Sequence, residues 1–324
     1  MTAEYVGVVP SSACYLLSQN EIADVLGITS NAVSMAASKL GLQPHRIGRR
    51  ALFPSSATRL FFEERGFKYP KEIISFQMLK GGSTKTSSAF NLAVRLNQYG
   101  AKVLAVDLDM QGNLTDALGV EVTTQPVFYH VAANEAKIEE AIVSVSEGLD
   151  LIPSDFENST LDFLITSRRL DLRRFIANAL GAVRNKYDFI IIDCNPALSS
   201  LNISIALSSD RVLIPVNPDK FAAKGLKKTI EEFERIGKEY GHPVNYNLLY
   251  TLYDGREATS QKYLIEYGSQ YKDRLLPIVI KRNADVKNAL DQKKSIFDFP
   301  KASAREDFDL FARGILAFEA RGNA

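Results

Sequence analysis

The sequence contains very little of two residue types that define other classes of protein. It has two cysteines and three histidines among 324 residues. Two cysteines do not make a disulfide framework, which favours a reducing, cytoplasmic environment. The histidines lie far apart and follow no zinc-ligand spacing, so we expect no structural metal.

Long apolar runs are also missing. No run is long enough to cross a bilayer, and the first residues lack the basic start and apolar core of a secretion signal. We therefore expect no membrane partner. The net charge of +1 is close to zero, so any contact with nucleic acid must come from a local basic patch. The length and the 46% apolar content suit one large globular domain with a small one beside it.

Acidic residues are locally absent between Asp24 and Glu63. A stretch with basic charges only is suited to contacts with phosphates. The basic residues there are Lys39, Arg46, Arg49, Arg50 and Arg59.

Local signals in the same region predict two short helices. Ser18 and Glu21 have the spacing of a capping box, which predicts a helix start, and Gly27 predicts its end. The segment 29–31 caps a second helix, which Gly41 ends. Two helices joined by a short glycine-containing turn form a helix-turn-helix arrangement.

A hairpin and a third helix complete this small domain, for which we predict residues 1–70. The segment 45–54 predicts a hairpin that turns at Gly48, and Pro54 opens the next helix. This order resembles winged helix-turn-helix DNA-binding domains of the MerR type. The alternative is a docking domain with a solvated basic face. The predicted DNA contacts are Ser30, Asn31, Ser34, Lys39, Arg46, Arg49 and Arg50.

The segment 72–88 predicts a strand, a phosphate-binding loop and a helix. Its apolar run suits a buried parallel strand, and Gly81 and Gly82 allow backbone N–H groups to converge on an anion. Lys85 would approach the phosphates, and the Thr86 hydroxyl could coordinate Mg²⁺. Thr84 stands where phosphate loops usually have glycine, which argues against a left-handed backbone there.

From Lys71 onward, apolar runs alternate with helical stretches, which predicts an α/β fold with a mostly parallel, doubly wound sheet over residues 71–324. Asp107 and Asp109 follow one predicted strand, and Asp193 ends another. Ligands of open α/β sheets bind at such strand ends. Asp193 is placed to hold Mg²⁺ as a Walker B aspartate does; the alternative for Asp107 and Asp109 is a turn that caps a helix.

Three motifs resemble the ParA/MinD family of ATPases. The loop KGG-x-x-K-T resembles the family's deviant P-loop, which begins with a lysine, here Lys80. The segment DLDMQGN resembles D-x-D-P-Q-G-N with Met110 replacing proline, and DCNPALS resembles D-C-P-P-S-L with Asn195 replacing the first proline. The resemblance extends over roughly residues 72–318.

The resemblance implies a role for individual residues. Lys80 would reach the phosphates of a partner protomer in a nucleotide-sandwich dimer, and Asp109 would orient the attacking water. Mg²⁺ would be held by Thr86, Asp107 and Asp193, and Asn217 with Pro218 would contact adenine. Lys281 and Arg282 fall where relatives contact DNA. ATP would bind to Gly81, Gly82, Ser83, Thr84, Lys85, Thr86 and Ser87.

The function implied is that of a ParA-type partition ATPase. Its ATP-bound homodimer would bind DNA non-specifically on the nucleoid, and a ParB-like centromere-binding protein would stimulate slow hydrolysis. The N-terminal region would add operator binding and autorepression. Two alternatives stay open: a related ATPase that positions a protein cargo on the nucleoid, and a transcription regulator that senses nucleotide.

Overall fold

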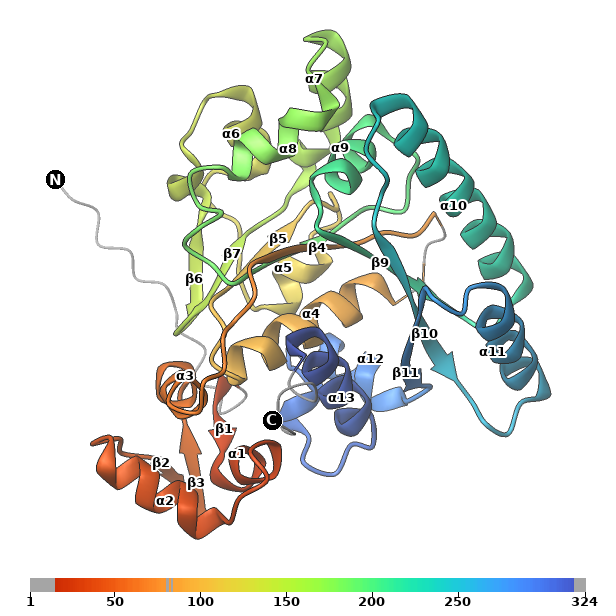
Figure 1. The fold of residues 1–324 in the computed structure, drawn as a ribbon. Coiled ribbons are helices and arrows are strands. Elements are labelled where there is room, and N and C mark those ends of the chain that lie inside the picture. Colours follow the sequence, from red (N-terminus) through yellow and green to blue (C-terminus); the bar gives the residue numbers. More distant parts are fainter. Residues whose placement is uncertain (1–14, 80–81, 83, 318–324) are drawn as a thin grey trace, which may run out of the picture.

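The computed structural model describes residues 15–79, 82 and 84–317, and its centre is an eight-stranded sheet (Figure 1). Neighbouring strands are parallel except β6 with β7, which are antiparallel. This confirms the predicted mostly parallel sheet. In spatial order the strands are β11 (Leu275–Lys281), β10 (Tyr246–Tyr253), β9 (Arg211–Val216), β4 (Glu72–Phe76), β8 (Phe189–Asp193), β5 (Val103–Asp107), β7 (Leu149–Ile152) and β6 (Val143–Ser146).

The central strands are buried on both faces, which explains their continuous apolar sequences. In β8, Phe189 and Ile191 pack into one hydrophobic cluster, whereas Ile190 and Ile192 pack into the cluster on the opposite face. All four side chains are fully buried. Asp193 ends this strand at the edge where the chain turns away.

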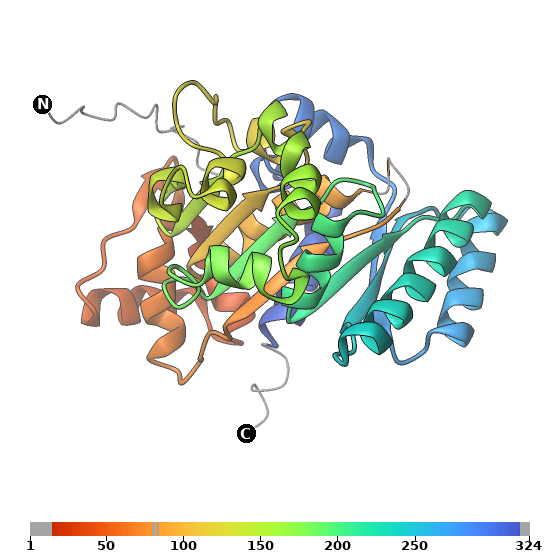
Figure 2. The same ribbon diagram turned by 90° about the horizontal axis from the view of Figure 1, so that it is seen from above.

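Helices cover both faces of the sheet. On one face lie α4 (Lys85–Gln98), α5 (Asn113–Ala117), α12 (Ala284–Asp291), η4 (Ile296–Asp298) and α13 (Ala304–Leu316). On the other lie α6 (Phe128–Ala133), η2 (Ile138–Ala141), η3 (Phe156–Thr160), α7 (Leu161–Ser167), α8 (Leu172–Leu180), α9 (Ser200–Ser208), α10 (Lys220–Tyr240) and α11 (Ala258–Gln270). Figure 2 shows α10 and α11 side by side along one end of the sheet.

The N-terminal region contains every element that its local signals predict. Ser18 and Glu21 form a complete capping box, and Thr29 accepts a hydrogen bond from Ala32 N. A hairpin follows, with Gly48 at its turn. The elements are β1 (Leu17–Ser18), α1 (Gln19–Val25), α2 (Ser30–Lys39), β2 (His45–Ile47), β3 (Arg50–Phe53) and α3 (Ser55–Glu63).

This region is packed firmly onto the sheet domain, beside the C-terminal end of α4 (Figure 1). Phe61 and Phe62 join the same hydrophobic cluster as α4 and α13, and the Phe62 ring meets that of Tyr99 edge to face with centroids 6.0 Å apart. Gly100 has φ +89, and a Cβ there would lie 2.6 Å from the Arg59 backbone. Only glycine permits this approach. The close approach and the shared hydrophobic cluster show that the two parts have one continuous core.

Within the described ranges, no helix is both long and apolar enough to cross a membrane.

Candidate nucleotide site

A cavity of about 710 Å³ opens at the carboxyl ends of the central strands. Its size lies within the range of about 300–1,000 Å³ that is typical of ligand sites. Three parts of the chain that the sequence motifs single out line it: the phosphate loop, the loop after β5 and the loop after β8. The lining residues from these motifs are Gly82, Thr84, Lys85, Thr86, Ser87, Asp109, Met110, Gln111, Asn113, Asn195, Pro196 and Ala197.

The first turn of α4 brings Lys85 and Thr86 into this cavity. Lys85 is 7% exposed, so its ammonium group is largely removed from water. The Thr86 hydroxyl donates a 2.6 Å hydrogen bond to Asp193 Oδ2. Because α4 begins at Lys85, its N-terminal N–H groups and the positive end of its dipole favour an anion at this point.

Asp107 and Asp193 lie opposite each other in the paired strands β5 and β8, and both are fully buried. Asp107 accepts hydrogen bonds from the N–H and hydroxyl of Thr115, each at 2.8 Å. Burial and the negative charge of Asp107 raise the pKa of Asp193 to about 8, although the Thr86 hydroxyl and Lys85 oppose this shift. Burial raises the pKa of Asp107 to about 6.

One oxygen of Asp193 has no partner within the protein. Oδ1 is buried and makes no hydrogen bond, although the group is charged above its raised pKa. Buried polar atoms are normally satisfied, so this oxygen fits a cation ligand. Thr86, Asp107 and Asp193 supply oxygen donors, as Mg²⁺ requires. No group of three or more His, Cys, Asp or Glu side chains suited to a metal occurs in the described part of the chain.

Asp109 lies at the mouth of the site, 8% exposed and on the cavity wall. Its N–H donates to Asp107 Oδ1 at 3.1 Å, and its Oδ1 accepts from Gln111 N at 3.1 Å. As a residue of the cavity wall, Asp109 can contact a bound ligand. Met110, which replaces the family's proline, is 41% exposed beside it.

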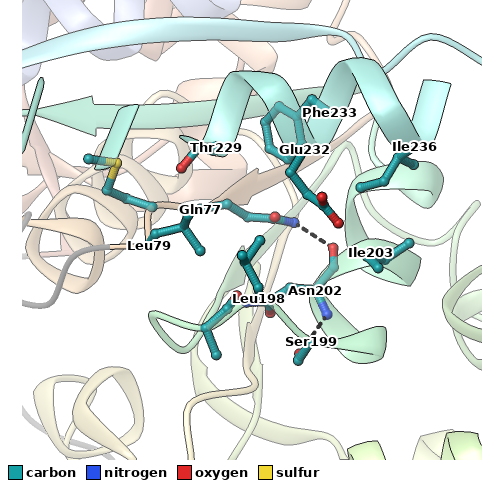
Figure 3. A pocket seen from close by; sticks show the side chains of 12 residues that line it. Gln77, Leu79, Leu198, Ser199, Asn202, Ile203, Thr229, Glu232, Phe233 and Ile236 are labelled. Carbon is teal, nitrogen blue, oxygen red and sulfur yellow. Dashed lines mark hydrogen bonds between the residues drawn. The ribbon is translucent and has the colours of Figure 1, made fainter. Parts of the chain in front are cut away.

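The loop after β8 is held from behind by α9. Asn202 Nδ2 donates to the carbonyls of Asn195 at 3.0 Å and Ala197 at 2.6 Å. A small pocket lies behind this loop, and Figure 3 shows Gln77 reaching Asn202, whose carbonyl accepts from Gln77 Nε2 at 3.1 Å. Asn195 thus takes a defined place although it replaces a proline. Cys194 is buried, and burial raises the pKa of its thiol, so this side chain is suited to packing.

Thr84 corrects one prediction from the sequence. Its backbone has φ 63 and ψ 18, in the left-handed region, where a side chain was expected to prevent that conformation. The prediction was wrong because it rested on the backbone preference of threonine, which takes no account of hydrogen bonds to distant strands. The Thr84 hydroxyl donates to Thr251 Oγ1 at 3.0 Å.

Asn217 and Pro218, predicted at adenine, are both buried. Asn217 Nδ2 donates to Gly82 O at 3.3 Å, so this side chain supports the phosphate loop. Neither residue is part of the cavity wall. Another part of the wall comes from β10 and α12: Leu252, Val286 and Leu290 are its apolar residues, and Asn283 and Lys287 its polar ones.

Sequence reasoning missed these wall residues and Thr251. Leu252 lies in strand β10 and Val286 lies on an amphipathic helix, and both patterns indicate only ordinary packing. Their proximity to the phosphate loop arises from the strand order, in which β10 is separated from β4 by β9. Local sequence carries no signal for that arrangement.

Other predicted residues fall into three groups. Lys80, Gly81 and Ser83 lie outside the described residues. Lys281 Nζ pairs with Asp307 at 2.6 Å and Arg282 with Glu257 at 3.2 Å, so both cations already have acidic neighbours. A separate hollow of about 430 Å³ collects the predicted DNA contacts Ser30, Ser34, Arg46, Arg49 and Arg50 with Gln19 and Asn20.

Asn31 and Lys39 are the two predicted DNA contacts of the N-terminal region that do not line this hollow. The Lys39 ammonium lies 3.2 Å from Glu64. Both residues belong to α2. The structure thus gathers the other five of the seven predicted N-terminal contacts around one hollow.

The fold and the site together define a P-loop nucleotide-binding protein. A family model described as an AAA domain matches residues 71–248, more than half of the chain. The Bacillus subtilis protein Soj, described as a sporulation initiation inhibitor, is 31% identical over 76% of this chain and 98% of its own. The chromosome partitioning protein ParA of Caulobacter vibrioides is 29% identical over 77% of this chain and 96% of its own.

A solved structure supports the same assignment. The structure of a plasmid partition protein of Borrelia burgdorferi bound to AMPPNP has a TM-score of 0.62 and 26% identity, covering 78% of this chain and 99% of that one. The chain belongs to the ParA/MinD family of P-loop ATPases.

Proposed function

We propose that this protein is a ParA-type partition ATPase that hydrolyses ATP with Mg²⁺. The observation that carries the proposal is the buried Asp193 at the phosphate loop, with one carboxylate oxygen bonded to Thr86 and the other without a partner. Mg²⁺ bound there neutralises phosphate charge during hydrolysis. The bound AMPPNP in the Borrelia partition protein supports an adenine nucleotide.

Each residue of the site has one task in this proposal. Lys85 and the N-terminal end of α4 bind the phosphates, and Thr86 with Asp193 fixes the cation side of the site. Asp109, which lines the cavity, orients the attacking water. Leu252, Val286 and Leu290 offer an apolar wall for the base.

A nucleotide-dependent homodimer is part of the proposal. Lys80 would reach the partner's phosphates across the sandwich, as the family resemblance implies. Large apolar side chains in the segments that follow β5, β7 and β8 are exposed: Met110 at 41%, Phe156 at 77% and Leu198 at 60%. A second copy on this edge would remove them from water, which favours association by about 25 cal/mol per Å².

DNA is the proposed track for this dimer, with a ParB-like partner that stimulates slow hydrolysis on the nucleoid. The N-terminal region would add operator recognition and autorepression through the hollow that Arg46, Arg49 and Arg50 share with α1 and α2. The relationship to a chromosome partitioning ParA favours a DNA cargo over a protein cargo.

Measuring ATP hydrolysis by the full chain tests the enzymatic part. Turnover should require Mg²⁺ and rise with DNA plus the partner encoded beside it. Turnover no higher than that of Lys85→Ala under these conditions would exclude an ATPase and favour a nucleotide-sensing regulator.

DNA binding needs a separate test with the whole protein. The N-terminal region shares its core with α4 and α13, so an isolated fragment would lose part of that core. Mobility shift on promoter DNA should show preference over random DNA, and Arg49→Glu should remove that preference. Equal affinity of the wild type for both DNAs would overturn operator recognition and leave the ATPase proposal intact.

A further inference from the structure

Thr84 adopts a backbone conformation that β-branched residues rarely occupy. Its φ of 63 and ψ of 18 lie in the left-handed region, one residue before α4 begins at Lys85. The Cβ of an L-residue crowds the carbonyl there, so such strain persists only where the surroundings hold it in place. Something in this fold must therefore stabilise Thr84.

A chain of hydrogen bonds supplies this stabilisation. The Thr84 hydroxyl donates to Thr251 Oγ1 at 3.0 Å, and the Thr251 hydroxyl donates to Asn217 Oδ1 at 2.8 Å. Asn217 Nδ2 then returns to the loop and donates to Gly82 O at 3.3 Å. Thr251 is fully buried and Asn217 is 6% exposed, so water does not compete for these bonds.

The strand that carries Thr251 is itself distorted at this point. The register between β10 and β11 shifts between Tyr250 and Tyr253, and Leu252 has φ 55. Bulges re-aim side chains and occur often beside active sites. Here the distortion places the Thr251 hydroxyl against the phosphate loop and Leu252 on the wall of the nucleotide cavity.

We propose that Thr251 and Asn217 are positioning residues that lock the phosphate loop through Thr84 and Gly82. The inference rests on the proposed ATPase function and assigns a role to two residues outside the phosphate-loop motif. They act through the loop backbone: Thr84 O receives the N–H of Ser88 at 2.9 Å and the Ser87 hydroxyl at 3.0 Å. Holding Thr84 therefore holds the first turn of α4, which presents Lys85.

The lock also explains how this chain tolerates threonine at a glycine position. Glycine adopts a positive φ without strain and needs no support. Threonine needs support, and its hydroxyl provides it by reaching a neighbour two strands away. A residue without a hydroxyl, such as alanine, would keep the strain and lose the bond.

A double-mutant cycle tests this in the full-length protein. Thr251→Val keeps the shape but removes the hydroxyl, and should weaken binding of a fluorescent ATP analogue with Mg²⁺ about five- to tenfold, the usual value of one buried hydrogen bond. Thr251→Ser should bind like the wild type. In a Thr84→Gly background, Thr251→Val should cost less than about twofold, because glycine needs no lock.

A matched control comes from Thr229, a buried threonine on α10 whose hydroxyl donates to Gly225 O within the same helix. Thr229→Val should leave nucleotide affinity unchanged. Equal losses from Thr251→Val in the wild-type and Thr84→Gly backgrounds would overturn the lock, as would no loss in either.

A second measurement needs no nucleotide. Hydrogen exchange of the Ser88 amide should be about five- to tenfold faster in Thr251→Val than in the wild type. In the Thr84→Gly background, Thr251→Val should leave the exchange rate as it is in Thr84→Gly alone. Unchanged exchange would overturn the inference. If the wild type binds no ATP analogue while exchange follows this pattern, the lock stands and the proposed ATPase function fails.

Discussion

Buried charged groups lie at both ends of α4, but they are fully paired only at the C-terminal end. At its N-terminal end, Lys85 and Thr86 face Asp193, whose pKa burial and Asp107 raise to about 8 and whose Oδ1 has no partner. At its C-terminal end, the Arg95 guanidinium lies 3.0 Å from Glu21 of the N-terminal region and donates to Asp309 at 2.6 Å. Burial opposes ionisation of Glu21, but Arg95, Ser18 and Arg305 outweigh it and hold the pKa of Glu21 below its usual value.

This difference separates a structural charge cluster from a functional one. The chain satisfies the C-terminal cluster by itself, with Arg95, Arg305 and Arg313 sharing Glu21 and Asp309. At the N-terminal end of α4, the carboxylates of Asp107 and Asp193 lie opposite each other, and Asp193 Oδ1 has no partner. Such incomplete pairing raises the free energy of the ligand-free state and leaves the site ready for Mg²⁺ with phosphates.

The largest expected effect comes from Arg95. Arg95→Met should lower the free energy of unfolding by about 3 kcal/mol, because it leaves buried carboxylates short of a positive charge. Urea unfolding measures this. Arg235→Met, which removes an exposed arginine on α10, should leave the unfolding midpoint unchanged. Similar urea midpoints for the two variants would contradict the structural role of the charge cluster around Arg95.

The opposite pattern should hold at Lys85. Lys85→Met should lower kcat for ATP hydrolysis about 10²- to 10³-fold, because it removes a fixed charge from the transferring phosphate. Its urea midpoint at pH 7 should stay near that of the wild type, because Asp193 keeps its proton below its raised pKa of about 8 and so leaves no unpaired charge there. Lys262→Met, an exposed lysine on α11, serves as the control and should keep full turnover.

Asp193 gives a smaller effect with a distinctive pH dependence. Between pH 4 and its raised pKa of about 8, native Asp193 retains a proton that the unfolded chain releases, so stability falls as pH rises. Asp193→Asn should therefore stabilise the nucleotide-free protein at pH 8 by about 1–3 kcal/mol, with a smaller gain at pH 5. Thermal unfolding at both values measures the gain; a variant less stable than the wild type at pH 8 would contradict it.

Glu21 should give the smallest effect, with the reverse sign. Its lowered pKa contributes stability above the usual value of 4.5, and this is lost as pH falls through the folded pKa. Acid titration from pH 6 to pH 3 should therefore destabilise the wild type more than Glu21→Gln. Parallel curves for the two proteins would show that this carboxylate does not titrate with folding.

Much of the fold follows from local patterns. The capping box of Ser18 and Glu21, the apolar run that ends at Asp193, and the alternation of strands with helices each predicted an element that the structure contains. These features depend on residues close together in the chain. The carboxylates of the site were predictable for the same reason, since strand ends of a parallel sheet meet at one edge.

The remainder depended on contacts between distant segments. The sequence argued against a left-handed backbone at Thr84, but the hydroxyl of Thr251, 167 residues away in the chain, accepts a hydrogen bond from Thr84. Asn217, predicted as a base contact, donates a hydrogen bond to Gly82 O, which no local pattern indicated. Glu21 looked like a capping residue alone, yet it also pairs with Arg95 and Arg305.

The sequence by itself determined the elements, the phosphate loop and the acids at the strand ends, because propensity, capping and periodicity act over a few residues. Only the tertiary structure decided which buried charges are paired and which strained residues are supported. Hydrogen bonds and ion pairs inside a core depend on which segments the sheet order brings together, and no local pattern encodes that order.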